Sequence, residues 1–292
     1  MRRREFLLAG LAAAAAPGWA ARPPRFTQGL LWRVTRKGVA PSHVFGTIHV
    51  ADPRLAELPA AVHDAFGGAR SLMVEFLADA YARERFLEAA LLPEPHTLEE
   101  VIGAEDFQRA VRGLEPIGLK PELINRLKPW SVLLNLRERR AAEGEPLDSQ
   151  LLELARARRI PCSQIEGVEE QIFTFDEFPM DAQVALLKHS LAHGEELLAL
   201  SDRTLEAYLR GDLAAIWRLR EDFAARYPEI AAYQAVMTKR IVYDRSVVMA
   251  FRMQRELRRG AAFVALGALH LFGDKGVLAL LEQDGFRTSR VA

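Results

Sequence analysis

Cysteine is nearly absent from this sequence. The chain of 292 residues contains one, Cys162, so it cannot form an internal disulfide. We predict that Cys162 is a buried small hydrophobe rather than a reactive thiol. Stability must then come from packing, and because 50% of the residues are hydrophobic, the chain can build a sizeable core.

Long runs of one charge sign are also missing. The 39 basic residues balance the 39 acidic residues, so the formal net charge is +0. A basic surface of the kind that binds nucleic acid or a membrane is therefore not expected. We expect a peptide or a small molecule as substrate, and no nucleic-acid partner.

No apolar segment near the start is long enough to span a bilayer well. The run at residues 6–16 follows an arginine cluster and precedes small residues at 18–21, which is the plan of a cleaved export signal. The stretch "RREFL" at residues 3–7 further resembles a twin-arginine signal. We expect a signal peptide at residues 1–20, a periplasmic or secreted protein, and no stable membrane span afterwards; an uncleaved amphipathic start is the alternative.

The pattern of residues 21–292 predicts one domain of the α/β (α+β) class. Strand-like runs divide at Lys37-Gly38, and a segment with helical spacing separates them from a third strand at 71–76. Further strands are predicted at 160–166, 261–271 and 286–291. We therefore expect a central mixed β-sheet flanked by helices.

The middle of the chain has helical spacing. We predict a large helical insertion or cap at about 97–159 and 168–259, with breaks at Pro179, Gly211 and Pro228. The stretch at 119–144 is predicted to be one helix interrupted at Pro129. Asp148 is predicted to cap the helix that follows it.

A Gly-x-x-His motif occurs at the end of two predicted strands. Gly46 precedes His49, and Gly267 precedes His270. If the two strand units pack side by side, both histidines lie at the same edge of the sheet. Neutral imidazole is the commonest metal ligand, and each glycine leaves room for close approach, so the pair indicates a metal site.

Two glutamates accompany these histidines. Glu75 interrupts an apolar strand and Glu166 ends another, where an unpaired carboxylate would be costly. A metal or a cation is the natural partner. The four residues together predict a shared site.

At this point several stretches carry a family resemblance. "HVFGTIHV", "SLMVEF", "LDSQLLELARARRIP", "GVEEQIFTFDEFPMDAQVALL", "DRSVVMA" and "AAFVALGALHLFGDKGVLALLEQDGFRTSRV" resemble the TraB/PrgY/GumN family, in order, over nearly the whole mature chain. The carboxy-terminal segment from Gly267 to Phe286 is the most specific part. The family includes the membrane-associated Tiki metalloproteases, and its fold is similar to that of erythromycin esterase and ChaN-like haem-binding proteins.

The resemblance implies a divalent-metal-dependent hydrolase, with manganese or cobalt favoured and zinc or iron possible. It implies metal ligands His49, His270 and Glu75, and catalytic roles for Glu75, Glu166 and Arg245, the last of which begins an "RSVVMA" segment with serine where asparagine is usual.

In the resulting hypothesis a metal lowers the pKa of a bound water, one glutamate takes the proton, and Arg245 stabilises the oxyanion. Which glutamate binds the metal and which is the base stays open. A non-catalytic peptide- or haem-binding protein and a small-molecule esterase are the alternative functions.

One further histidine pair suggests a metal site and is rejected. His189 and His193 stand at i and i+4 in "HSLAH", but Ser190 occupies the position where a His-Glu-x-x-His protease needs glutamate. We predict a solvated or partly buried face of an amphipathic helix.

Overall fold

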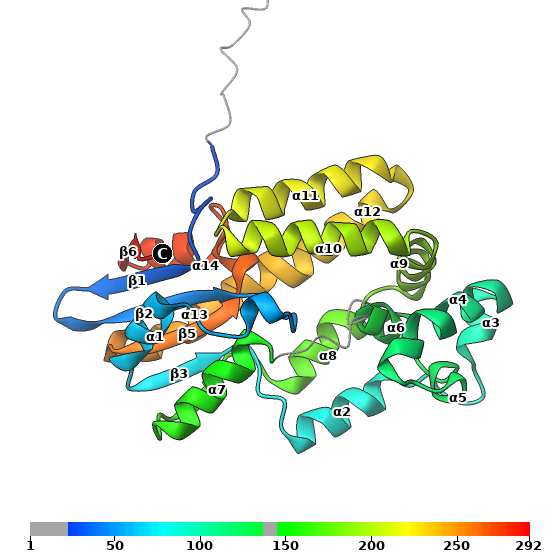
Figure 1. Ribbon diagram of the computed structural model, residues 1–292, viewed down its shortest axis with the longest axis horizontal. Coiled ribbons are helices and arrows are strands. Elements are labelled where there is room, and N and C mark those ends of the chain that lie inside the picture. The colour runs from blue at the N-terminus through cyan, green and yellow to red at the C-terminus, as the bar shows by residue number, and fades with distance from the viewer. Residues whose placement is uncertain (1–22, 137–144) are drawn as a thin grey trace, which may run out of the picture.

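The computed structural model describes residues 23–136 and 145–292, and it shows a mixed β-sheet beside a large group of helices (Figure 1). The predicted signal at 1–20 lies outside the described residues. The predicted α/β class with a central mixed sheet is confirmed. The strands are β1 (Leu31–Arg36), β2 (Val39–Thr47), β3 (Ser71–Val74), β4 (Cys162–Gln164), β5 (Ala262–Gly267) and β6 (Arg287–Arg290).

The strand order is β4-β3-β5-β2-β1-β6. Strands β4, β3, β5 and β2 run parallel to one another, whereas β1 is antiparallel to both β2 and β6. Residues 263–266 of β5 are fully buried, as expected for a central parallel strand covered on both faces. Strand β5, which carries the second Gly-x-x-His motif, therefore lies directly beside β2, which carries the first.

Helices occupy most of the remaining chain, and the predicted breaks at Pro179, Gly211 and Pro228 all separate helices. The helices are α1 (Ala60–Gly67), α2 (Ala80–Ala90), α3 (Leu98–Ile102), α4 (Ala104–Leu114), α5 (Pro121–Ile124), α6 (Pro129–Asn135), α7 (Leu147–Ala157), α8 (Val168–Asp176), α9 (Met180–Ala192), α10 (Gly194–Leu209), α11 (Leu213–Arg226), α12 (Pro228–Thr238), α13 (Arg245–Arg259) and α14 (Val277–Gln283). A π-helical turn, Lys239–Asp244, leads directly into α13.

These helices divide between two hydrophobic cores. Helices α7, α13 and α14 pack with the sheet, through residues such as Leu151, Met253 and Leu278. Helices α3 to α6 share a second core with α9 and α12, and Figure 1 shows α3 to α6 at the opposite end of the molecule from β1 and β6. Helices α7 and α13 are thus held against the sheet, and the first residues of each lie next to the strand ends.

Several predictions about local structure are wrong. The stretch at 119–136 forms two short helices, α5 and α6, because Leu127 between them pairs with Leu91 instead of continuing a helix; residues 137–144 lie outside the described residues. Strand β5 stops at Gly267, and Ala268–Leu271 forms a 3₁₀ turn. Cys162 is exposed because β4 is the edge strand and all three of its residues face solvent.

No helix in the described part of the chain is both long and apolar enough to span a membrane.

Candidate functional site

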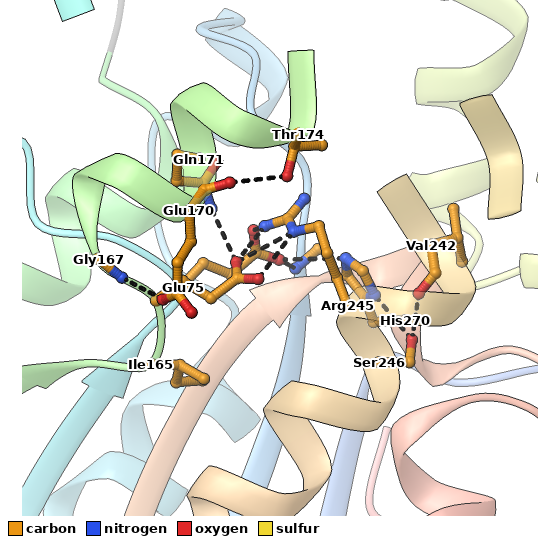
Figure 2. Close-up of polar contacts among 12 residues, drawn as sticks. Glu75, Ile165, Gly167, Glu170, Gln171, Thr174, Val242, Arg245, Ser246 and His270 are labelled. Carbon is orange, nitrogen blue, oxygen red and sulfur yellow. Dashed lines mark hydrogen bonds and ion pairs between the residues drawn. The ribbon is translucent and has the colours of Figure 1, made fainter. Parts of the chain in front are cut away.

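Four residues with ionisable side chains follow the carboxyl ends of four adjacent parallel strands. His49 comes two residues after β2, and His270 lies in the 3₁₀ turn after β5. Glu75 directly follows β3, and Glu166 comes two residues after β4. Because parallel strands end at the same edge of a sheet, the structure brings all four to one place, as the paired motifs indicated. Arg245, the first residue of α13, reaches the same place (Figure 2).

Glu75 lies at the centre of this group and is only 7% exposed. Its Oε1 is 3.7 Å from Nε2 of His270, and its Oε2 is 3.8 Å from Nε2 of His49. The backbone N–H of Gly267 donates to Oε1, and Nη2 of Arg245 donates to Oε2 at 2.7 Å. The carboxylate of Glu75 therefore faces both imidazoles and is also hydrogen-bonded to the guanidinium of Arg245.

Arg245 links this carboxylate to Glu166. Its Nε lies 3.1 and 3.0 Å from the two oxygens of Glu166, and its Nη2 donates to Oε2 of Glu166 at 2.7 Å. Gln171 donates a further hydrogen bond of 2.7 Å to the same oxygen, and Figure 2 shows Gln171, Arg245 and Glu75 converging. Both oxygens of the buried Glu166 are thus engaged by Arg245 and Gln171.

The environment shifts the pKa values of the three groups that face one another. Burial alone would raise the pKa of Glu75, but the charges of His270, Arg245 and His49 and the Gly267 N–H lower it to about 2. Burial lowers the pKa of His270 to about 4. Burial also lowers that of His49, but the hydrogen bond and charge of Asp148 outweigh it and raise the pKa to about 9.

The hydrogen bonds of Ser246 determine which nitrogen of His270 carries the proton. The Ser246 hydroxyl donates to the carbonyl of Val242 at 2.7 Å, so it accepts from Nδ1 of His270 at 2.8 Å. Nδ1 then carries the proton, and Nε2 presents its lone pair toward Glu75 (Figure 2). The serine that stands in the family's usual asparagine position serves here as the acceptor for this ring.

Asp148 plays the corresponding part for His49, and the sequence did not single it out as a site residue. Its Oδ2 is 3.0 Å from Nδ1 of His49, and its Oδ1 accepts from Oγ1 of Thr47 at 3.1 Å. The capping prediction was wrong because α7 begins after Pro146, which places Asp148 inside the first turn. An acid in a first helical turn is too common a pattern to indicate a site.

The two Gly-x-x-His motifs are offset by one residue in the sheet. In the parallel pairing of β2 with β5, Thr47 lies opposite Gly267, and Gly46 lies opposite Leu266. Successive residues of a strand point to opposite faces, whereas paired residues share a face. Gly46 and Gly267 therefore lie on opposite faces of the sheet and contact different residues.

The surroundings of each glycine show this difference. A Cβ on Gly46 would come within 2.9 Å of the backbone Cα of Ala268 and 2.7 Å of Cδ1 of Leu271, so this glycine permits close packing after β5. A Cβ on Gly267 would instead lie 3.2 Å from Oε1 of Glu75 and 3.6 Å from Nε2 of His49. Gly267 therefore keeps open the space between the candidate ligands.

Two imidazole nitrogens and a carboxylate form a donor set that divalent metals bind. Within residues 23–136 and 145–292, no three side chains of histidine, cysteine, aspartate or glutamate are already arranged as metal ligands. Ligands held about 2.0–2.2 Å from a tetrahedral metal lie about 3.3–3.6 Å apart. The separations of Glu75 from His49 and His270, 3.8 and 3.7 Å, exceed that range by tenths of an ångström.

The charges of the site also favour a dication. Asp148, Glu75 and Glu166 are three carboxylates, and the guanidinium of Arg245 contacts Glu75 and Glu166. When both imidazoles are neutral, as metal binding requires, this group carries two uncompensated negative charges. A divalent cation between the histidines would balance them.

Comparison with known proteins places the chain in a family. The TraB/PrgY/gumN family profile matches residues 30–290. The chain belongs to the TraB/PrgY/gumN family. The predicted family is therefore confirmed.

Its similarity to individual members of the TraB/PrgY/gumN family is low but extends along most of the chain. It is 27% identical to the uncharacterized protein YbaP of Shigella flexneri over 258 residues, which cover 85% of this chain and 90% of YbaP. It is 26% identical to the metalloprotease TIKI2 of Xenopus tropicalis and 24% identical to human TIKI1, with 88% of this chain covered in both cases. The alignments cover 58% and 60% of those two proteins. No solved structure matches the chain.

The rejected histidine pair lies apart from this site. His189 and His193 are on α9 and at its end, and their ring centroids are 4.4 Å apart. Both rings contact Tyr227, at 4.5 and 4.6 Å. His189 is 9% exposed, so the predicted partly buried helix face is what this TraB/PrgY/gumN member has.

Proposed function

We propose that this protein is a divalent-metal-dependent hydrolase that cleaves peptides. The observation that supports the proposal most is that Nε2 of His49 and Nε2 of His270 face the two oxygens of one buried carboxylate, Glu75. These three residues would hold the metal, a set compatible with manganese, cobalt, iron or zinc. Relatives named metalloproteases in the same family add support.

In this proposal Arg245 and Glu166 prepare Glu75 for its role. Arg245 keeps Glu75 ionised and fixes its position, because a guanidinium hydrogen bond joins them. Glu166 anchors Arg245, since both of its oxygens already accept hydrogen bonds from that side chain. We therefore assign metal binding to Glu75 and a supporting role to Glu166, and this assignment remains a proposal.

The metal, when bound, would supply a Lewis acid that activates a water and polarises a carbonyl. The protein's own residues supply the rest. Glu75, as a buried carboxylate with a lowered pKa, can accept a hydrogen bond from a water that approaches from the side of His49. His270 stays neutral near neutral pH because burial lowers its pKa to about 4.

A peptide substrate is favoured by the openness of one side of the site. The side chain of His49 is 57% exposed, whereas that of His270 is 6% exposed. An extended chain can therefore reach the group from the His49 side without entering an enclosed pocket. Extended peptides are therefore admitted as substrates, whereas an enclosed pocket would restrict the site to small molecules.

The test compares the mature chain with His49→Ala, His270→Ala and the exposed-histidine control His96→Ala. Each protein is analysed for bound metal and assayed against a peptide library and activated esters. We expect the first two variants to lose both metal and peptide cleavage, and the control to retain both. Retention of metal and activity by both site variants would overturn the proposal.

The same preparation separates the alternative functions. A strong visible absorption band in the purified protein would indicate haem binding. Cleavage of esters without cleavage of peptides would indicate an esterase. Peptide binding without cleavage in the presence of metal would indicate a peptide-binding protein.

We also propose that the protein is exported by the twin-arginine route to the periplasm or beyond. The support is the "RREFL" stretch and the apolar run after it. Export of an Arg3→Lys, Arg4→Lys double variant should fail, while the control Arg2→Lys should be exported. Normal export of the double variant would exclude this route.

A further inference from the structure

The two histidines of the site differ in what can hold their rings. His270 is buried on all sides, and packing restricts its ring in addition to the hydrogen bond from Nδ1 to Ser246. His49 lies beyond the end of β2, and 57% of its side chain is exposed. Packing on one side cannot fix a ring that is open to solvent on the other, so a specific contact must hold it if Nε2 is to stay directed at Glu75.

Asp148 makes that contact, and it is itself firmly held. One of its oxygens lies 3.0 Å from Nδ1 of His49, and the other accepts from Thr47, the buried last residue of β2. Asp148 sits in the first turn of α7, whose Leu147 and Leu151 are fully packed in the sheet core. The carboxylate is thus fixed to the sheet from two directions.

We propose that Asp148 is the positioning residue for His49, accepting the hydrogen bond from Nδ1–H and so directing Nε2 toward Glu75. A carboxylate accepts but does not donate, so its partner nitrogen carries the proton and the other nitrogen is left to bind a metal. The consequence for metal binding rests on the proposed function. The orientation of the ring does not, because it is a property of the metal-free protein.

The variants follow from the two oxygens of Asp148. Asp148→Ala removes both contacts, and Asp148→Asn keeps an acceptor for His49 but removes the charge. Thr47→Val releases the second oxygen with little change of shape and tests the idea if Asp148→Ala does not fold. Asp181→Ala is the matched control, because Asp181 occupies the same position of α9 after a proline but is exposed.

Two readouts are measured on each variant. The first is the dissociation constant of Co²⁺. Loss of a partner that orients a metal-binding histidine costs about 10–100-fold in metal affinity, so we expect that loss for Asp148→Ala, a smaller loss for Asp148→Asn, and none for Asp181→Ala. The second is the Nδ1 proton of His49 by ¹⁵N nuclear magnetic resonance in the metal-free protein, protected in the wild type and unprotected in Asp148→Ala.

The outcomes separate the two proposals. If Asp148→Ala folds, binds Co²⁺ as tightly as the wild type and keeps a protected Nδ1 proton, Asp148 does not position His49, and the hydrolase proposal stands. If the wild type binds no metal but its Nδ1 proton is protected only when Asp148 is present, the positioning role stands and the metal site is wrong. If Asp181→Ala loses as much Co²⁺ affinity as Asp148→Ala does, the positioning role is also overturned. Loss of any acidic residue from a first helical turn would then explain both results.

Discussion

Replacing Gly267 with alanine should close the candidate site without unfolding the protein. The added Cβ would lie 3.2 Å from Oε1 of Glu75, 3.5 Å from Cδ2 of His270 and 3.6 Å from Nε2 of His49. A metal held by these residues would need the same space. The backbone at Gly267, with φ −56° and ψ 132°, suits alanine as well as glycine.

The expected magnitudes differ for binding and for folding. Only one contact is tight, and loss of a glycine's freedom in the unfolded chain offsets part of the strain, so the free energy of unfolding should change by no more than about 1 kcal/mol. Metal affinity should fall by at least about 100-fold, which corresponds to about 2.7 kcal/mol. Binding and folding are therefore expected to separate.

The assay titrates Co²⁺ into wild type, Gly267→Ala and Gly68→Ala, and records peptide cleavage and thermal unfolding for each. Gly68 is the matched control because a Cβ there meets nothing within 4 Å. Gly68→Ala should behave as the wild type in all three measurements. If Gly267→Ala binds metal and cleaves peptides as well as the wild type does, the space beside Gly267 is not the metal site.

Three other predictions concern the same region. Gly46→Ala should destabilise the fold by about 1–3 kcal/mol in chemical denaturation, because its Cβ would lie 2.9 Å from the backbone Cα of Ala268 and 2.7 Å from Cδ1 of Leu271. An unchanged midpoint would contradict that close packing. Arg245→Ala removes the guanidinium that is paired with the buried carboxylates of both Glu75 and Glu166 and should cost about 3–5 kcal/mol. A loss below about 1 kcal/mol would show that water or another cation takes its place. In the metal-free protein the raised pKa of His49 contributes stability that is complete below pH 6.5 and is lost as the pH rises through about 9. His49→Gln should therefore make the free energy of unfolding depend less on pH at alkaline pH. An unchanged dependence would contradict the raised pKa of His49.

The positions of His49 and His270 show what sequence periodicity can supply. Two apolar runs that each end in Gly-x-x-His predicted two strands whose histidines share one sheet edge, and β2 and β5 are indeed parallel neighbours. The strand pattern extended the second run to residue 271, because a 3₁₀ turn of buried apolar residues has the same composition as a strand. Alternation within the sheet, and with it the different faces of Gly46 and Gly267, needs the register, which a single sequence does not contain.

The partners of the carboxylates could be predicted only in part. The apolar surroundings of Glu75 required a cation or a metal, and the structure places Arg245 against it. Sequence alone could not divide the roles of Glu75 and Glu166, since each is a lone carboxylate after a strand. Their contacts distinguish them: Glu166 is enclosed by Arg245 and Gln171, and Glu75 faces the imidazoles.

Asp148 could not have been found from the sequence. It lies 99 positions along the chain from His49, and helix α7 must pack on the sheet before the two side chains meet. A first-turn acid has an adequate local explanation in the helix dipole. The sequence pattern therefore predicted only a residue at the end of a helix, whereas the carboxylate of Asp148 lies beside His49 at the carboxyl ends of the strands.

The position of β5 has a consequence for the order in which the protein can be assembled during synthesis. The strand at the middle of the sheet is the fifth of six along the chain, so the β1–β2 hairpin and the β3–β4 pair have no common neighbour until residues 262–267 have been made. Contacts that join such distant segments form late and slow folding. A nascent chain that ends before β5 lacks both His270 and the strand that aligns His49 with Glu75, so a partially synthesised protein cannot form the site, and the candidate chemistry becomes possible only in a chain that is almost complete.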